Sequence, residues 1–526
     1  MVTPSSDPSS SRQPAQPGQP AVPAQPAVPA QPALPPLPWS DRLPPECDVV
    51  IVGGGFSGLL TLVALAQAVP AARVVLVERR PARSPGVAYG ACDPVHLLNV
   101  PANRMGAQTS DPAAFHTWLE QRWPGAYAPG AFAPRCLYGS YLTEFVLDRL
   151  KGVWNRVCLV RDAVVHVDHV ADGVELLMAS GRTCAASAVV LAPGLPPARA
   201  PWAQVAANAP RRQLVADPWD AGAFDGIDPD QPVLVVGSGL TAIDVVLSLK
   251  ERGHRAAITL VSRNGKLPLP HVAPGEPPHA FTRDQVAGGP AALMHTLRAA
   301  AKARMAAGQG WQPVLDALRP FTVEVWRSWT AEEKKRFLRH ARPFWEIHRH
   351  RAPREVLQRL EAWMKEGSLR IMHGQVAGVS GAPSGLLHVQ VSPAPRQGTA
   401  PDGRVQTLEV ARVFNCVGPT VSVRQTADPL LRSLIASGVA ASDPAGLGLR
   451  VDAEGRLLNA DGKADPVMFL VGALRRAESW ESTAVPELRV QAEVAAHAVA
   501  SLLAARGGGL VSRRHSVGAA SAEGCG

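Results

Sequence analysis

Two glycine-rich stretches in this chain have the residue types and spacing of turns that bind dinucleotide phosphates. The first is G-x-G-x-x-G at Gly53, Gly55 and Gly58, and the second is G-x-G-x-x-A at Gly237, Gly239 and Ala242. In such a turn the first glycine permits a tight bend, the second lets the backbone approach a pyrophosphate, and the third position allows a helix to pack closely on a strand. The free N–H groups of the helix then face the negative phosphates. The sequence therefore predicts two dinucleotide sites in one chain.

The residues that follow each turn indicate which nucleotide it holds. Glu78 ends the strand-like run RVVLVE, 20 residues after Gly58, where a carboxylate accepts hydrogen bonds from ribose hydroxyls. After the second turn the run AITLVSR ends in Ser262 and Arg263, a hydroxyl and a guanidinium that suit the 2′-phosphate of NADPH. When one chain has two such sites, the usual pairing is FAD at the N-terminal site and a nicotinamide cofactor at the second, so we expect FAD at the first turn and NADPH at the second. NADH is the alternative if Arg263 is only a solvated charge at a strand end.

Strands and helices must alternate if these two turns are to be positioned. CDVVIV and LLTLVALAQAV have the patterns of a strand and a helix around the first turn, and VLVV and AIDVVLSLKE have them around the second. Strands that alternate with helices of this length form parallel βαβ units. The predicted fold class is α/β, with two Rossmann-like dinucleotide-binding domains, the second inserted in the first.

The C-terminal region is expected to return to the first domain and complete the flavin site. The runs VFNCVGP from Val413 and MFLVGALRR from Met468 have the pattern of apolar strands that end in glycine. A helix is expected after them, with Ser482 and Thr483 as candidate caps and Pro486 near its first turn. Its N-terminal dipole would point toward the flavin and stabilise negative charge there.

The predicted domain boundaries follow from these elements and from composition. Fourteen of the 50 prolines lie in the first 45 residues, around the repeat QPAVPA, QPAVPA, QPALPP, which favours polyproline II and buries no core. A PxxP docking ligand is the alternative function for this leader. The expected parts are a disordered leader at 1–45, the first part of the FAD-binding domain at 46–220, an inserted NAD(P)H-binding domain with an Arg/His-rich helical segment at 221–405, the C-terminal part of the FAD-binding domain at 406–505, and a flexible tail at 506–526. The irregular stretch at 392–404 is predicted to be a long hairpin loop.

A loop after the first βαβ unit, HLLNVPANRM from His96 to Met105, is a candidate flavin contact. Its asparagines offer donors and acceptors to ring edges, and Met105 can pack on a ring face. A purely structural loop is the alternative. Together with the two turns and the C-terminal return, the candidate cofactor-binding residues are Gly53, Gly55, Phe56, Ser57, Gly58, Glu78, His96, Asn99, Met105, Gly237, Ser238, Gly239, Leu240, Thr241, Ala242, Arg263, Gly472 and Val485.

A basic segment supplies the candidate catalytic residues. Residues 319–359 hold eleven Lys or Arg against five Asp or Glu, with aromatic residues interleaved, and so carry much of the net charge of +9. Arg349 and Arg351 from this segment are candidates for an anion site, and His271 from the run KLPLPH is a candidate general acid or base. The alternatives are a solvated helical face or an oligomer contact for the arginines, and a loop histidine without a role.

Five stretches of the chain together resemble a bacterial family of FAD/NAD(P)-binding monooxygenases that includes flavin-dependent urate hydroxylases and aspartate N-hydroxylases. They are VVIVGGGFSG, GVAYGACDPVHLLNVPANRMGA, VLVVGSGLTAIDVVLSL, FLRHARPFWEIHRHR and ESTAVPELRVQA. The resemblance implies an FAD-dependent, NAD(P)H-using enzyme that forms a flavin hydroperoxide and hydroxylates a small anionic substrate with molecular oxygen. Urate, converted to 5-hydroxyisourate, is the first substrate that we predict. The alternatives are N-hydroxylation of an amino acid such as L-aspartate, and an NAD(P)H–flavin reductase or electron-transfer protein that hydroxylates nothing.

Composition and cysteine spacing exclude several other classes. The seven cysteines include no Cys-x-x-Cys pair, which argues against a dithiol reductase, a zinc ribbon and a disulfide framework. No metal site is expected, because the histidines of HRHR lack carboxylate or cysteine ligands at suitable spacing. The chain has no apolar run of about 18 residues and no RNA or DNA module, so neither a membrane span nor a nucleic-acid partner is expected. We expect a cytoplasmic protein, whose oligomeric state stays open.

Overall fold

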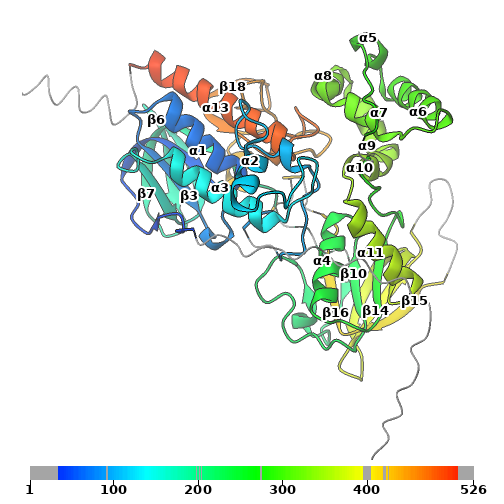
Figure 1. Ribbon diagram of the computed structural model, residues 1–526. Helices are drawn as coiled ribbons and strands as arrows, with labels where there is room; N and C mark the ends of the chain where they lie inside the picture. Colours follow the sequence, from blue (N-terminus) through cyan, green and yellow to red (C-terminus); the bar gives the residue numbers. More distant parts are fainter. Residues whose placement is uncertain are drawn as a thin grey trace, which may run out of the picture.

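The computed structural model describes residues 34–90, 93–196, 198, 200, 202, 204–272, 275–394, 404–418, 422–424 and 426–507 (Figure 1). Residues 1–33 of the predicted leader, 395–403 of the predicted hairpin loop and 508–526 of the predicted tail lie outside this part of the chain. Within it the strands form three β-sheets, and no helix is long and apolar enough to cross a lipid bilayer.

The first sheet has nine strands and holds the first glycine-rich turn. Its order is β1–β4–β3–β2–β7–β18–β17, with the hairpin of β5 and β6 attached to β7. The pairs around the turn, β2 with β3 and β2 with β7, are parallel. The strands are β1 (Trp39–Ser40), β2 (Glu46–Val52), β3 (Val74–Glu78), β4 (Val157–Arg161), β5 (Val164–Val170), β6 (Gly173–Met178), β7 (Thr183–Leu191), β17 (Arg456–Leu458) and β18 (Ala464–Leu470).

Helices of the first domain cover this sheet. The helices are α1 (Phe56–Ala68), α2 (Ala114–Arg122), α3 (Arg135–Arg149), α12 (Pro429–Ala436) and α13 (Val485–Ala505), with short 3-10 turns at Pro81–Arg83, Ala102–Arg104 and Ala473–Arg475. In Figure 1 the red helix α13 and the blue helix α1 lie side by side over the sheet, and their apolar residues share one core with β2 and β3. Strand β2 is buried on both faces, as expected of a parallel strand with covered faces.

The second and third sheets form the inserted part of the chain. The second sheet has the order β12–β11–β10–β16–β9, and all of its pairs are parallel. Helices α4 (Leu240–Glu251) and α11 (Arg354–Lys365) pack on it. Its strands are β9 (Leu214–Val215), β10 (Val233–Val236), β11 (Ile258–Ser262), β12 (Leu369–His373) and β16 (Arg412–Asn415), and those of the third sheet are β8 (Gln204–Val205), β13 (Gln375–Gly381), β14 (Leu387–Ser392) and β15 (Gln406–Val410).

A helical arm rises from the second sheet between β11 and α11 and appears in green in Figure 1. Its helices are α5 (Arg283–Val286), α6 (Pro290–Ala306), α7 (Gln312–Ala317), α8 (Thr322–Ser328), α9 (Ala331–His340) and α10 (Arg342–Arg349), with a 3-10 turn at Arg319–Phe321. Its tryptophan-rich core includes Leu447 and Trp480, which belong to the C-terminal return. The arm therefore joins the inserted part to the first domain.

The predicted α/β fold class with Rossmann-type domains is confirmed, but the place of one strand was wrong. The run from Val413 lies in β16, which pairs parallel with β10 in the second sheet. Only the run from Met468, in β18, returns to the first sheet beside β7. An apolar strand ending in glycine has the same pattern in either sheet, so sequence alone could not assign it. The expected boundary between 405 and 406 therefore lies too early, because residues 406–415 complete the second and third sheets.

Candidate active site

The first glycine-rich turn lies between β2 and α1, and two of its glycines are required by close backbone contacts. Gly53 has φ +109°, and a Cβ there would lie 2.2 Å from the carbonyl oxygen of Ala192. A Cβ on Gly58 would lie 1.9 Å from the carbonyl oxygen of Gly53. Gly55 precedes α1 in an extended conformation without a side-chain cap, which suits the approach of an anion to the helix N-terminus.

Glu78 closes this turn at the end of β3. Its Oε2 accepts a hydrogen bond from the Gly54 N–H at 2.7 Å, and its Oε1 accepts one from the Arg80 N–H at 2.7 Å. A carboxylate has about four lone-pair sites, so both oxygens can still accept bonds from ribose hydroxyls. The partly exposed acid, the close-packed glycines and the uncapped helix start therefore fit the adenosine diphosphate part of FAD.

The C-terminal return reaches the same end of α1. Gly472 follows β18 with φ +96°, and a Cβ there would lie 3.2 Å from the hydroxyl oxygen of Ser57. The Gly472 N–H donates to Oε1 of Gln491 on α13 at 2.9 Å. Ser57 and Gly472, two predicted cofactor-binding residues that are distant in sequence, thus lie next to one another.

The N-terminus of α13 differs from the prediction. Its cap is Ala484, without a side-chain hydrogen bond, so Ser482 and Thr483 do not cap the helix. Ser482 is fully buried, and its Oγ has no hydrogen-bond partner within the described part of the chain. Neither residue can be the cap, because the helix begins at Val485 and the cap position is the residue directly before it.

Three predicted cofactor contacts are instead core side chains. Phe56, Met105 and Val485 are 7%, 1% and 2% exposed, and all three belong to one apolar cluster that includes Phe115 and Tyr138. The Met105 side chain is enclosed by protein and presents no face to a flavin ring. Met105 therefore fits the alternative of a structural loop better than that of a flavin contact. The backbone N–H of Phe56 can still take part in the N-terminus of α1.

The second glycine-rich turn repeats the geometry of the first. Gly237 has φ +125°, and a Cβ there would lie 2.3 Å from the carbonyl oxygen of Cys416. A Cβ on Gly239 would have no heavy atom within 4 Å, so the turn is open at the position where a pyrophosphate would approach. Helix α4 starts at Leu240 without a side-chain cap, Thr241 lies in its first turn, and Ala242 is fully buried. This fits a second dinucleotide.

Ser262 and Arg263 end β11 beside this turn. The Ser238 hydroxyl donates to the Lys266 carbonyl at 2.7 Å and lies 2.9 Å from the Ser262 hydroxyl. Ser238 therefore braces the neighbouring loop. The Arg263 side chain is exposed and makes no hydrogen bond or ion pair with the described part of the chain, so its guanidinium is available to a phosphate.

His96 does not face a cofactor. Its ring is buried, Nδ1 accepts from the Asp93 N–H at 3.3 Å, and Nε2 lies 2.8 Å from the Ser248 hydroxyl. The ring also packs edge-on against Trp219 at 5.6 Å. Both nitrogens are thus bound by protein, and one of the partners lies on α4 of the inserted part. Burial lowers the pKa of His96, and Arg135 adds to this effect, while the negative charges of Asp244 and Asp93 oppose it.

The three candidate catalytic residues lie close together. Pro270 and Ala352 form a bridge between their two segments, and the His271 N–H donates to the Ala352 carbonyl at 3.2 Å. Arg351 is 3% exposed and pairs with Asp316 through Nη2, while its Nε and Nη1 have no partner within the described residues. The segment from 319 to 359 therefore contributes a buried arginine, not only a solvated face.

Electrostatics keeps His271 neutral. Burial lowers its pKa to about 4, and the positive charge of Arg351 adds to this effect, while Asp316 and a hydrogen bond with the Asn99 backbone oppose it. The imidazole packs on the Phe132 ring at 4.4 Å, and its Nε2 is buried without a partner in the described part of the chain. Asn99 thus brings the predicted flavin-side loop to His271 of the inserted part.

Arg349 joins the arm to the segment before α13. It forms an ion pair with Glu481 at 2.6 Å, and the two side chains are 14% and 6% exposed. Burial acts to lower the pKa of Arg349, but Glu481 outweighs it and the net pKa is raised. Parallel pairs join Arg319 to Glu487 at 2.8 Å and Arg327 to Glu478. Arg349 is therefore an ion-pair residue at a domain contact.

Sequence reasoning missed the residues that join the two domains. Asp244 and Ser248 lie on one face of α4, and they contact Arg135, Asp93 and His96 of the first domain. The polar residues at positions 244, 248 and 252, four apart within an apolar helix, were a signal that could have indicated this contact. Among the described residues, no three His, Cys, Asp or Glu side chains are grouped as metal ligands.

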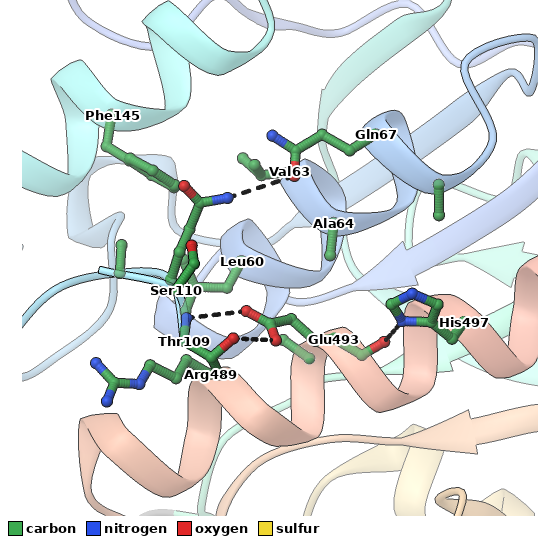
Figure 2. A pocket seen from close by; sticks show the side chains of 14 residues that line it. Leu60, Val63, Ala64, Gln67, Thr109, Ser110, Phe145, Arg489, Glu493 and His497 are labelled. Atoms are coloured by element: carbon green, nitrogen blue, oxygen red, sulfur yellow. Dashed lines mark hydrogen bonds between the residues drawn. The ribbon is translucent and has the colours of Figure 1, made fainter. Parts of the chain in front are cut away.

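A separate cavity of about 370 Å³ lies away from both turns, between α1 and α13 (Figure 2). Glu493 and Arg489 of α13 line it and hold the loop beneath it: Glu493 accepts from the Thr109 N–H at 3.0 Å, and Arg489 donates to the Gly106 carbonyl at 2.9 Å. On α1 the lining begins at Leu60, more than one helical turn beyond Gly55. The cavity therefore borders the outer side of the loop that follows Met105.

Residues 50–196 match the model of an FAD-NAD(P)-binding family. The match covers the first turn, Glu78 and the loop from His96 to Met105, and it confirms the predicted cofactor class. Proteins of Mycobacterium tuberculosis and Mycobacterium bovis, described as uncharacterised, are 25% identical over 531 residues, which cover 87% of this chain and 96% of theirs.

Solved structures share the fold along nearly their whole length. The ornithine N-hydroxylase of Kutzneria sp. 744, a structure with reduced FAD, NADP+ and L-ornithine, has a TM-score of 0.60 at 17% identity, covering 86% of this chain and 99% of that one. The ornithine hydroxylase of Pseudomonas aeruginosa has a TM-score of 0.59 at 14% identity, covering 87% and 100%. The L-lysine 6-monooxygenase of Pseudomonas syringae has a TM-score of 0.55 at 16% identity, with the same coverage.

Proposed function

We propose that this protein is an FAD-dependent, NADPH-using monooxygenase that hydroxylates the amino group of a small amino acid. The observation that carries the proposal is the presence of two glycine-rich turns in two different sheets, within a fold that amino-acid N-hydroxylases share end to end. When bound, the two cofactors supply hydride transfer and the activation of oxygen. The three solved relatives described above act on ornithine or lysine, so the N-hydroxylation alternative is better supported than urate.

The protein's own residues would bind and orient the two nucleotides. Gly53, Gly58 and the N-terminus of α1 would hold the FAD pyrophosphate, and Glu78 would accept from its ribose. At the second turn, Gly239 and the N-terminus of α4 would hold the other pyrophosphate. The exposed Arg263 would bind the 2′-phosphate, which is why we favour NADPH over NADH.

The substrate would lie where the flavin-side loop, residues 96–105, meets the segment from 349 to 351. Buried donors without partners are rare in proteins, and Arg351 offers two of them next to the unpartnered Nε2 of His271. A carboxylate can accept charge-assisted hydrogen bonds from such arginine donors. A neutral His271 can accept a hydrogen bond from a substrate ammonium group. We therefore propose an amino acid, and favour one that carries additional negative charge, such as aspartate.

The experiment is a substrate panel on the purified FAD-loaded protein. NADPH oxidation, oxygen uptake, peroxide release and hydroxylamine formation are measured with L-aspartate, L-ornithine, L-lysine and urate. The proposal predicts that one amino acid accelerates NADPH oxidation and yields a hydroxylamine with little peroxide. Urate-stimulated turnover would favour urate hydroxylation instead. NADPH oxidation that releases only peroxide, unaffected by every compound, would identify a reductase and refute the proposal.

A further inference from the structure

One face of α4 is attached to the first domain at three successive helical turns. Asp244 accepts from Arg135 at 2.6 Å, Ser248 lies 2.8 Å from Nε2 of His96, and Arg252, which follows the helix, donates to Asp93 at 2.6 Å. The three α4 positions are four residues apart and so lie on the same side of the helix. Each of these three polar residues therefore has a partner in the other domain.

The hydrogen bonds around His96 fix the position of its ring proton. Because the Asp93 N–H donates to Nδ1, the proton must lie on Nε2, where the Ser248 hydroxyl at 2.8 Å and the Asp244 carbonyl at 3.1 Å can accept it. The Ser248 hydroxyl then donates to Oδ2 of Asp93 at 3.3 Å, and Arg252 donates to the same carboxylate oxygen. The network closes on itself, so rotating α4 relative to the loop would leave several of these groups without partners.

The Arg135–Asp244 pair makes this orientation specific. The two side chains are only 13% and 4% exposed, so separating them would leave a buried charge unpaired. A buried ion pair adds little net stability compared with apolar residues, but it penalises every arrangement in which the two groups do not meet. Because Gly239, where the second pyrophosphate would approach, is the N-cap of α4, the angle of α4 also sets where the nicotinamide end of the nucleotide would lie.

We propose that the residues joining α4 to the first domain, Asp244, Ser248, Arg252, Arg135, His96 and Asp93, are positioning residues that aim the nicotinamide at the flavin for hydride transfer. Arg327 and Arg349 attach the arm to the segment before α13, and Arg319 attaches it to α13 itself, so the inserted part is held at a second place. A part of the chain held at two places keeps one orientation. This inference rests on the proposed use of both cofactors, but not on the identity of the substrate.

The test compares flavin reduction by NADPH in the wild type with that in variants of these six joining residues, which we call seam variants. Asp244→Asn leaves Arg135 without its anionic partner, and Ser248→Ala opens the network around His96. The double variant Arg135→Met with Asp244→Leu removes the ion pair without leaving a buried charge, so it retains the fold if the single variant does not. Asp230→Asn is the matched control, because Asp230 pairs with Arg255 on the same domain, with the two side chains 62% and 66% exposed.

We expect FAD content, reduction by dithionite and the NADPH dissociation constant to stay within about twofold of wild type in all variants. Anaerobic flavin reduction by NADPH should fall on the order of 10- to 100-fold in the seam variants, as expected when reacting atoms are misplaced by about 1 Å. Hydrogen exchange should increase in the peptides that cover residues 93–98 and 240–252 only in the seam variants. Asp230→Asn should change neither quantity.

Two results would overturn the inference, and they differ from failure of the proposed function. Seam variants that are reduced by NADPH as fast as wild type, or that show unchanged exchange in α4, would show that the seam does not position the nucleotide. A wild-type protein whose flavin NADPH does not reduce would instead refute the proposed function, and the positioning role would fall with it.

Discussion

Replacing Gly239 with alanine should separate nucleotide binding from folding at the second turn. A Cβ at Gly239 meets no heavy atom within 4 Å, whereas a Cβ at Gly237 would lie 2.3 Å from the Cys416 carbonyl oxygen. Gly239 also has φ −82° and ψ −170°, an extended conformation that alanine adopts freely, while Gly237 has φ +125°. The two glycines of one motif are therefore required for different reasons.

The magnitudes follow from these positions. At the N-cap of a helix, alanine is less favourable than glycine by about 0.5–1 kcal/mol. Alanine also has less conformational freedom than glycine in the unfolded chain, which stabilises the folded state by about 0.4–1 kcal/mol and offsets this loss. The Tm of Gly239→Ala should therefore stay within about 2 °C of wild type. Each hydrogen bond that a backbone N–H loses to a charged phosphate oxygen removes about 1.5–3 kcal/mol, which is roughly 10- to 150-fold in affinity.

The assay is the NADPH concentration dependence of flavin reduction, combined with thermal unfolding. Gly239→Ala should raise the half-saturating NADPH concentration by at least about tenfold with an unchanged Tm. Gly237→Ala should lower the Tm by several degrees, because both strain and a backbone clash must be relieved. A Gly239→Ala protein that binds NADPH like wild type would show that the pyrophosphate does not approach this turn.

Three further outcomes can be measured on the same protein. Arg263→Ala should raise the half-saturating concentration of NADPH by roughly tenfold or more and leave that of NADH unchanged; equal effects on both would remove the assignment of the 2′-phosphate. Trp326→Ala removes an indole that is 2% exposed and stacks on Trp480 at 4.9 Å, so docking of the arm should weaken by about 3–5 kcal/mol, seen as faster proteolysis of residues 283–349. The pKa of His96 is lowered from 6.5 in the folded protein, mainly by burial and also by Arg135, against the opposing charges of Asp244 and Asp93. Stability should therefore be lost as the pH falls below about 6.5, because the unfolded state takes up the proton first. In His96→Gln this loss should be smaller, and an identical pH profile would contradict the burial argument.

The turns could be predicted from sequence because their geometry is local. Gly53, Gly58 and Gly237 act through backbone contacts that a short motif defines, and Glu78 lies one strand away from its turn. The three candidate catalytic residues were also found close together, because His271 and Arg351 lie on loops next to the inserted sheet.

The remaining features depend on partners that are distant in sequence. His96 was expected to face a flavin, but its partners Asp244 and Ser248 lie 148 and 152 residues further along the chain. Met105 is a core residue because α2 and α3 enclose it, and no local pattern distinguishes that from a ring contact. The register of β16 beside β10 is likewise a property of the assembled sheet.

Because the arm packs against the first domain, the inserted part is not expected to be stable as a separately expressed fragment. Trp326, Trp329 and Phe337 of the arm share one apolar core with Trp480 and Leu447, which come from the other side of the domain boundary. If the inserted part were expressed alone, these aromatic side chains would form a solvent-exposed apolar patch, and we expect that fragment to aggregate. The chain has two glycine-rich turns in two sheets, but its parts are not independent modules, because this core contains side chains from both of them.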